Sequence, residues 1–274
     1  MAARYRRPVR GEPRGSSVDF KIIGLSALAA VLIAGVAWAA WYALEHQPLE
    51  LDARGCPPGP SRGGLVVVLD LTDAIDPAQM RRVRAEIARA VAGAPDWSEV
   101  AVGAVRPIAE GDGVAFSACK PLDGADASEL TQNPRQIRAR YEAAFLAPLG
   151  AVLDEMAVVQ GADSSPIMET IQATISQAPG WAEASGQRRL LLVSDLLQHS
   201  DAFSLYRGGG WDAFRKTSGY DRLSRNLEDV SVDILRLPRP GARGPDPEAV
   251  DDFWAGYLDR QGARPPRIIV VGDL

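Results

Sequence analysis

The sequence predicts an α/β domain with a mostly parallel, Rossmann-like β-sheet that carries helices on both faces, preceded by one transmembrane helix. Three observations support this prediction. Short apolar runs rich in branched residues are typical of strands that are buried on both faces. These runs alternate with amphipathic helical patterns, as in βαβ units. A run of 23 residues without a charge lies near the N-terminus and predicts the membrane helix.

The charge of the chain is unevenly distributed. Residues 1–21 carry six basic and two acidic side chains, whereas the whole chain of 274 residues has a formal net charge of −5. This N-terminal tail is polar and rich in Arg, and we expect it to be disordered and cytoplasmic. The acidic remainder has no basic cluster. This argues against nucleic acid as a partner, because binding to phosphates needs Lys or Arg gathered on one face.

Residues 22–44 are predicted to form the transmembrane helix. At about 1.5 Å per residue they are long enough to cross a ~30 Å hydrocarbon core. Trp38, Trp41 and Tyr42 lie near the end of the run, where aromatic rings favour the headgroup region. Arginines before the run and acidic residues after it predict a single-pass protein of the bacterial inner (cytoplasmic) membrane, with its C-terminal domain in the periplasm or otherwise extracytoplasmic. The alternative is a cleaved signal peptide, since residues 37–39 resemble a cleavage site, but the apolar run is longer than a signal core of ~7–15 residues.

Residues 45–63 are rich in Pro and Gly and are predicted to link the membrane helix to a domain over residues 64–274. The domain is organised around residues 64–73 (GLVVVLDLTD), whose lack of polar alternation predicts a central strand. Residues 76–79 (DPAQ) combine an N-cap Asp, a Pro at N1 and a Gln at N3, so a helix is expected to about residue 92. Residues 98–105 and 114–119 are predicted to pair as a β-hairpin, because Gly and Asp lie between them.

The rest of the domain continues the alternation of helix and strand. Helices are expected over 134–153, with a bend at Pro148, and over 167–177 and 247–261; strands are expected over 190–195, 230–237 and 268–271. Residues 196–225 are polar, aromatic and Gly-rich, which predicts a long loop around a short helix. Trp211, Phe214 and Tyr220 in this segment form either a partner surface or packing beneath the loop, and packing is the favoured interpretation.

Cys56 and Cys119 are the two cysteines of the chain. Outside the cytoplasm they would meet an oxidising compartment, where a disulfide could join the segment before the central strand to a neighbouring edge strand. Two unpaired, small hydrophobic side chains are the alternative, and the sequence does not decide between them. No CxxC motif is present, so zinc or redox chemistry is not indicated.

Oxygen-bearing side chains occur at three comparable places in the domain. Asp70, Thr72 and Asp73 follow the central strand, Ser164 and Ser165 precede a helix, and Asp195 ends the strand over 190–195. Open α/β sheets bind ligands at the carboxyl ends of their strands, so these side chains lie where a site is expected. The ordinary alternative is that they cap turns and helices.

These segments resemble the von Willebrand factor A-type (VWA) domain and its metal-ion-dependent adhesion site. In that family a D-x-[ST]-x-S motif follows the first strand, a Thr comes from a later loop, and an Asp ends the fourth strand. The motif is degenerate here, because Ala74 replaces its last Ser. Hard oxygen donors suit Mg²⁺, and also Mn²⁺ or Ca²⁺. The resemblance implies the metal ligands Asp70, Thr72, Ser165 and Asp195, with Asp73 and Ser164 as further candidates.

Three functions follow as hypotheses. The first is a membrane-tethered module that binds a protein partner, within a bacterial envelope-associated complex; the resemblance implies that a partner's carboxylate completes the coordination of the metal. The second is a metal-dependent phosphoesterase-type hydrolase, although Thr72 stands where haloacid-dehalogenase-type phosphatases have a second Asp. The third is a structural scaffold subunit with a vestigial site. We expect a protein that is not an enzyme, because His46 and His199 offer no credible Ser/His/Asp set and no phosphate-binding Gly motif follows a strand.

Overall fold

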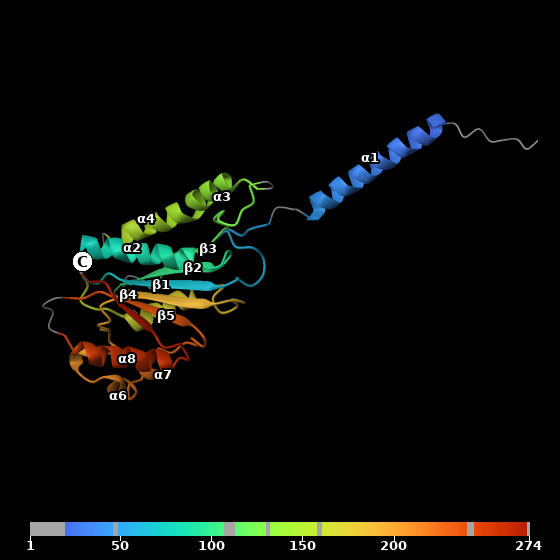
Figure 1. Cartoon of the computed structure of the whole chain (residues 1–274). Coiled ribbons are helices and arrows are strands. Elements are labelled where there is room, and N and C mark those ends of the chain that lie inside the picture. The colour runs from blue at the N-terminus through green and yellow to red at the C-terminus, as the bar shows by residue number, and fades with distance from the viewer. Residues whose placement is uncertain are drawn as a thin grey trace, which may run out of the picture. The chain divides into compact units, whose positions relative to one another are not determined.

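The computed structural model describes residues 20–45, 49–106, 113–129, 132–157, 161–239 and 244–272. The chain divides into two compact units, Met1–Leu49 and Glu50–Leu274 (Figure 1). Most of the predicted disordered tail, and most of the predicted turn between residues 105 and 114, lie outside the described residues.

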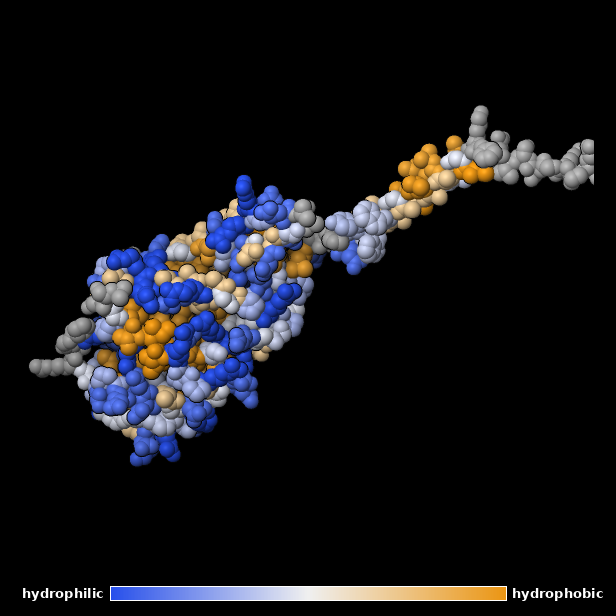
Figure 2. All heavy atoms as spheres, viewed as in Figure 1, coloured by the Kyte–Doolittle hydropathy of each residue, from blue (hydrophilic) through white to orange (hydrophobic). Residues whose placement is uncertain are grey.

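The described part of the first unit is helix α1 (Phe20–Glu45). Its segment Ile23–Glu45 is long and apolar enough, by length and composition, to cross a membrane. Apolar side chains lie along α1 in Figure 2, and those from residue 23 onward are exposed to solvent. The rings of Trp38 and Tyr42 stack with centroids 5.7 Å apart. A helix of this kind is found both in membrane anchors and in signal sequences.

The described part of the second unit contains one six-stranded sheet with the order β3-β2-β1-β4-β5-β6. Strand β3 pairs antiparallel with β2, and the other pairs are parallel. The predicted fold class, a mostly parallel α/β sheet, is therefore confirmed. The strands are β1 (Gly64–Asp70), β2 (Glu99–Val105), β3 (Val114–Cys119), β4 (Arg188–Ser194), β5 (Ser231–Arg236) and β6 (Arg267–Val270).

Helices cover both faces of the sheet (Figure 1). One core contains Val66 and Val68 of β1 with residues of α5 and α8, and the other contains Leu65 and Val67 with residues of α2, α3 and α4. Alternate side chains of β1 thus enter opposite cores, as expected for a strand buried on both faces. The helices of this unit are α2 (Pro77–Ala92), α3 (Pro134–Tyr141), the π-turn η2 (Glu142–Leu146), α4 (Ala147–Met156), α5 (Ile167–Ser176), the 3₁₀ turn η3 (Leu205–Arg207), α6 (Trp211–Phe214), α7 (Gly219–Arg222) and α8 (Pro247–Asp259).

Two local expectations differ from the structure in detail. The helix expected over 134–153 contains the π-turn η2 immediately before α4. Pro148 accounts for this, because it has no N–H to donate to the carbonyl four residues earlier, and the helix widens there.

The segment 196–225 holds three short helical turns rather than one. Its Phe214 is buried and its ring lies 5.6 Å from that of Phe253 in α8, so packing is the role that the structure shows for it.

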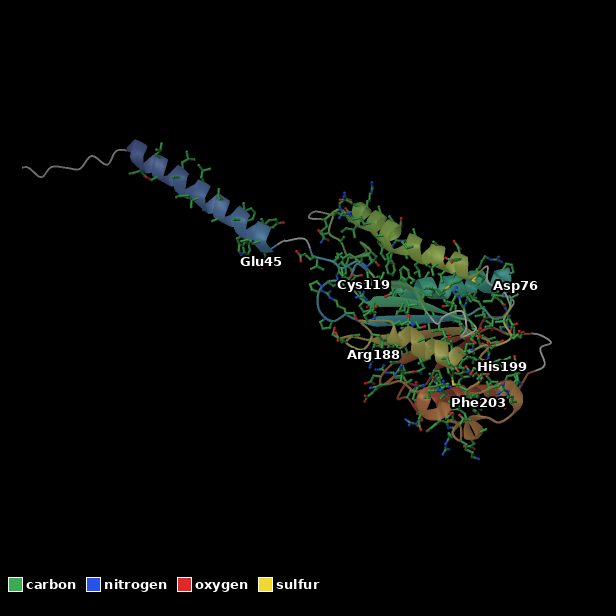
Figure 3. The ribbon with its side chains drawn as sticks, turned by 180° about the vertical axis from the view of Figure 1, so that it is seen from behind. Glu45, Asp76, Cys119, Arg188, His199 and Phe203 are labelled. Atoms are coloured by element: carbon green, nitrogen blue, oxygen red, sulfur yellow. A yellow bond between two sulfur atoms is a disulfide. The ribbon has the colours of Figure 1, made fainter. Side chains whose placement is uncertain are left out.

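The segment that leads into the sheet is fixed at the amino end of β2. Cys56 and Cys119 form a disulfide, so the structure has the bonded alternative of the two that the sequence left open. Figure 3 shows Cys119 and Arg188 at one end of the sheet and Asp76 and His199 at the other. The chain therefore enters this unit at the end of the sheet opposite to the carboxyl ends of β1 and β4.

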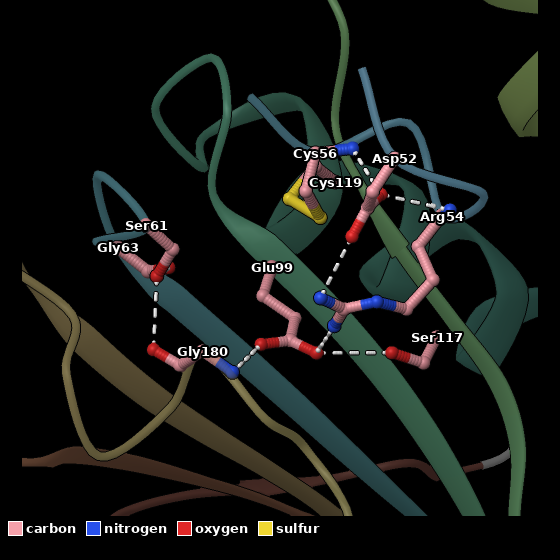
Figure 4. Close-up of a disulfide and its surroundings, with 9 residues drawn as sticks. All are labelled: Asp52, Arg54, Cys56, Ser61, Gly63, Glu99, Ser117, Cys119 and Gly180. Atoms are coloured by element: carbon pink, nitrogen blue, oxygen red, sulfur yellow. Dashed lines mark hydrogen bonds and ion pairs between the residues drawn. A yellow bond between two sulfur atoms is a disulfide. The ribbon is translucent and has the colours of Figure 1, made fainter. Parts of the chain in front are cut away.

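A buried carboxylate reinforces this attachment (Figure 4). Glu99 is 2% exposed, and its Oε1 accepts hydrogen bonds from Arg54 Nη1 at 2.8 Å and from Ser117 Oγ at 3.0 Å. Its Oε2 accepts a bond from the backbone N–H of Gly180. Because the charge is both ion-paired and hydrogen-bonded, the cost of burying it is offset.

Gly103 lies in the middle of β2, where α5 approaches the sheet, and replacing it with Ala should destabilise the domain by about 2 kcal/mol through overpacking. A Cβ atom at this position would overlap Thr174 Oγ1 and lie 3.2 Å from Thr174 Cβ. Thr174 is 1% exposed, and its hydroxyl donates to the carbonyl of Thr170 at 2.8 Å. Thermal unfolding of Gly103→Ala should show a melting temperature lower by roughly 4–8 °C. Gly113→Ala is the control, since a Cβ there meets no atom within 4 Å, and equal melting temperatures for the two variants would contradict the packing described here.

Candidate functional site

The candidate site lies where the strand order of the sheet reverses, between β1 and β4. Both strands end there, β1 at Asp70 and β4 at Ser194. In open α/β sheets the connections leave such a point in opposite directions, and the resulting crevice is the usual place for a ligand.

Asp70 is the centre of this site. It is 1% exposed, and its two carboxylate oxygens accept hydrogen bonds from three segments of the chain. Oδ1 accepts bonds from the backbone N–H of Thr72 at 3.2 Å and from Thr72 Oγ1 at 2.7 Å. Oδ2 accepts bonds from Ser165 Oγ at 3.1 Å and from Ser194 Oγ at 2.7 Å. A buried carboxylate with this many donors is held rigidly in one orientation.

The backbone around Asp70 holds the donors in place. Ser165 and His199 form an antiparallel bridge, with N–H to carbonyl distances of 2.7 and 2.8 Å. The N–H of Ala162 donates to the carbonyl of Thr72 at 2.9 Å, which fixes the other side of the same loop. Leu196 has a positive φ of 70° and donates its N–H to Ser194 Oγ at 2.7 Å. A positive φ at a branched residue is uncommon, and the turn after β4 keeps it because the serine hydroxyl stabilises it.

Asp195 lies beside this cluster but has different hydrogen-bond partners. Its Oδ1 accepts a bond from the N–H of Leu197 at 2.9 Å, and its Oδ2 accepts one from Arg239 Nε at 3.3 Å. Burial is the main cause that raises the pKa of Asp195 above its usual range, and the charge of Asp70 raises it further. The N–H of Leu197 and the guanidinium of Arg239 act in the opposite direction.

Arg239 belongs to the site although the sequence analysis did not select it. Its Nη1 donates to the carbonyl of Ala74 at 2.6 Å, and its Nη2 lies 3.8 Å from Asp73 Oδ2. The available signal was its position, three residues after β5 and therefore at the same end of the sheet as Asp70 and Asp195. Ser194, which donates to Asp70, stands beside Asp195 among the oxygen-bearing residues of the sequence but was not among the predicted metal ligands.

A polar hollow of about 310 Å³ opens beside these groups. Ser164 and Asp73 line it but make no hydrogen bond to Asp70 among the described residues. Tyr206 is 50% exposed at the rim, and its ring lies 5.5 Å from that of His199. Partial burial raises the pKa of Tyr206, the charges of Asp195, Asp73 and Asp70 raise it further, and the charge of Arg239 lowers it. The lining residues are Thr72, Asp73, Ala162, Asp163, Ser164, Ser165, Asp195, Leu197, His199 and Tyr206.

The arrangement does not fit a resident divalent ion. Ala74 offers no side-chain oxygen, and the carboxylates of Asp195 and Asp73 face the guanidinium of Arg239. Thr72 and Ser165 are suitable oxygen donors, but an ion would have to displace Arg239 to gain Asp195 as a ligand.

Comparisons with known proteins add a likeness of fold. No family model matches the sequence, and no curated protein matches it. One similar structure is a von Willebrand factor type A protein from Catenulispora acidiphila, with 13% identity and a TM-score of 0.38 over 78% of this chain and 39% of that chain. Another is an aerotolerance-related membrane protein from Bacteroides fragilis, with 14% identity and a TM-score of 0.34 over 75% of this chain and 90% of that one.

A third similar structure is the VWA domain of SpRpn10, with 9% identity and a TM-score of 0.40 over 78% of this chain and 90% of that chain. This chain thus spans less than half of the first of these structures and most of the other two. Because all three TM-scores are below 0.5, none of these likenesses carries an argument about function. The fold class depends on the strand order and the connections of the chain itself.

Proposed function

We propose that the chain is a membrane-tethered, VWA-like protein-interaction module of the bacterial envelope, and that the polar hollow beside Asp70 is its partner-binding surface. The observation that carries the proposal is the convergence of Thr72, Ser165 and Ser194 on one buried carboxylate. This convergence fixes three loops around an open hollow. Binding loops held by a rigid scaffold are typical of recognition sites.

The placement of the hollow suits a tethered receptor. The disulfide and Arg54 fix the incoming chain at the amino end of β2, whereas the hollow lies at the carboxyl ends of β1 and β4. A strand of seven residues is about 23 Å long, so a partner at the hollow would bind at the far end of the sheet from the disulfide.

We also propose that α1 stays in the membrane, with the N-terminus in the cytoplasm and the domain on the periplasmic side. The six basic residues within 1–21 support this orientation through the positive-inside rule. The disulfide supports it independently, because disulfides persist in oxidising compartments and are rare in the cytosol. On this basis the partner belongs to an envelope-associated complex.

The geometry favours binding over hydrolysis. Both oxygens of Asp70 accept hydrogen bonds and the residue is 1% exposed, which does not suit a nucleophile. His199 has its Nδ1 2.7 Å from the hydroxyl of Ser204, but Ser204 is 3% exposed and does not line the hollow. Turnover of a phosphoester by the purified chain, lost in Asp70→Asn, would contradict this proposal.

Affinity capture of the full chain from detergent-solubilised membranes tests the binding surface. Tyr206→Ala should reduce the amount of the co-purified partner several-fold, because Tyr206 is an exposed aromatic residue at the rim of the hollow, a residue type that often dominates binding energy. Leu122→Ala is the matched control, since Leu122 is 42% exposed and follows β3 at the opposite end of the sheet. Equal capture by both variants, or loss only in Leu122→Ala, would refute the assignment of the surface.

A further inference from the structure

We propose that Arg239 is the resident cation of the site and takes the place that a divalent metal ion would otherwise fill. The proposal goes beyond partner binding, because it concerns the charge balance of the site in the free protein. It follows from three contacts, from the residue at position 74, and from the burial of the ion pair.

The guanidinium of Arg239 bridges two of the three segments that supply the predicted metal ligands. Nε donates to Asp195 Oδ2 at 3.3 Å, after β4, and Nη1 donates to the carbonyl of Ala74 at 2.6 Å, after β1. Nη2 lies 3.8 Å from Asp73 Oδ2. The planar fork of an arginine can hold several oxygens at once, which a compact ammonium cannot do in the same geometry.

Two departures from the metal-binding pattern meet at one residue. Ala74 has no side-chain oxygen to offer an ion, and its backbone carbonyl accepts a hydrogen bond from Arg239 instead. Position 74 therefore lacks the side-chain oxygen of the metal-binding motif, and its backbone contacts Arg239.

Burial strengthens the ion pair between Arg239 and Asp195. The side chain of Arg239 is 17% exposed and that of Asp195 is 8% exposed, so solvent screens this pair only weakly. A second cation that approached Asp195 would meet repulsion from the guanidinium at close range. The position of Arg239 is set by the end of β5, where the N–H of Leu237 donates to the carbonyl of Ser194 at 2.9 Å and Arg236 pairs with Asp251.

Titration with Mn²⁺, followed by the electron paramagnetic resonance signal of the free ion, tests the proposal on the full chain in detergent. The wild-type chain should show no saturable binding below about 1 mM. Arg239→Gln should bind one Mn²⁺ at least about tenfold more tightly, because the repulsive charge is gone while the oxygens of Thr72, Ser165 and Asp195 remain. Adding Asp195→Asn to Arg239→Gln should abolish this gain.

Arg215→Gln controls for the change in net charge, since Arg215 is exposed and pairs only with the nearby Asp212 among the described residues. It should leave Mn²⁺ binding as weak as in the wild type. The proposal fails if the wild-type chain binds Mn²⁺ in a manner that Asp195→Asn removes, or if folded Arg239→Gln gains no binding. If Arg239→Gln does not fold, the titration of the wild-type chain can still refute the proposal. Neither result depends on partner capture, so this inference and the proposed function can fail separately.

Discussion

Replacing Cys56 and Cys119 together by alanine should lower the free energy of unfolding by about 4 kcal/mol. The two cysteines are 63 residues apart, and opening a loop of that size releases chain entropy of this order in the unfolded state. The segment before β1 would also lose its covalent attachment to the end of β3, so Arg54 would be less well held against Glu99. Urea unfolding of the full chain in detergent, with the domain signal followed by fluorescence, measures the change.

Reduction provides the control for this prediction. The wild-type chain should unfold at a lower urea concentration when a reductant is added, and the double alanine variant should not respond to the reductant. Free thiols in the unreduced wild type, or equal midpoints with and without reductant, would show that the bond is absent or has no energetic role.

Asp70→Ala should destabilise the domain by about 3 kcal/mol and abolish partner capture. The substitution removes the acceptor for the hydroxyls of Thr72, Ser165 and Ser194, and each buried donor left unsatisfied costs roughly 1–3 kcal/mol. The loss should stay below the sum of these costs, because removing the charge of Asp70 also relieves its repulsion of Asp195. Thermal unfolding and the capture assay, run on the same preparation, give both readouts.

Asp73→Ala is the control for Asp70→Ala, because the two residues are close in sequence and differ in burial. The side chain of Asp73 is 59% exposed, and its contact with Arg239 is long, so the loss of stability should be within about 0.5 kcal/mol. Similar destabilisation by the two variants would show that Asp70 is not the centre of the site.

Much of the fold could be predicted because its signals are local. The run over 64–70 lacks polar residues since both of its faces are buried, and the Asp76 cap with Pro77 sets the start of α2. That side chains would converge near Asp70 could also be predicted, because the carboxyl ends of parallel strands share one edge of the sheet. Thr72 and Ser165 do meet Asp70 in the structure.

The role of Asp195 could not be read in the same way. Its partner, Arg239, lies 44 residues away in a loop with no regular pattern, and the direction of that loop depends on tertiary packing. Whether Cys56 and Cys119 pair depends likewise on the distance between a loop and the end of β3, which spacing in sequence does not determine. Contacts of this kind can be identified only from the three-dimensional path of the chain.

Site-specific photo-cross-linking in intact membranes tests the central claim most directly, namely that the hollow beside Asp70 receives the partner. A photoreactive phenylalanine analogue is placed at Tyr206, on the rim of the hollow, or at Leu122, at the other end of the sheet. We predict a discrete adduct of higher mass from position 206 and none from position 122. An adduct from position 122 alone, or equal adducts from both positions, would contradict the account.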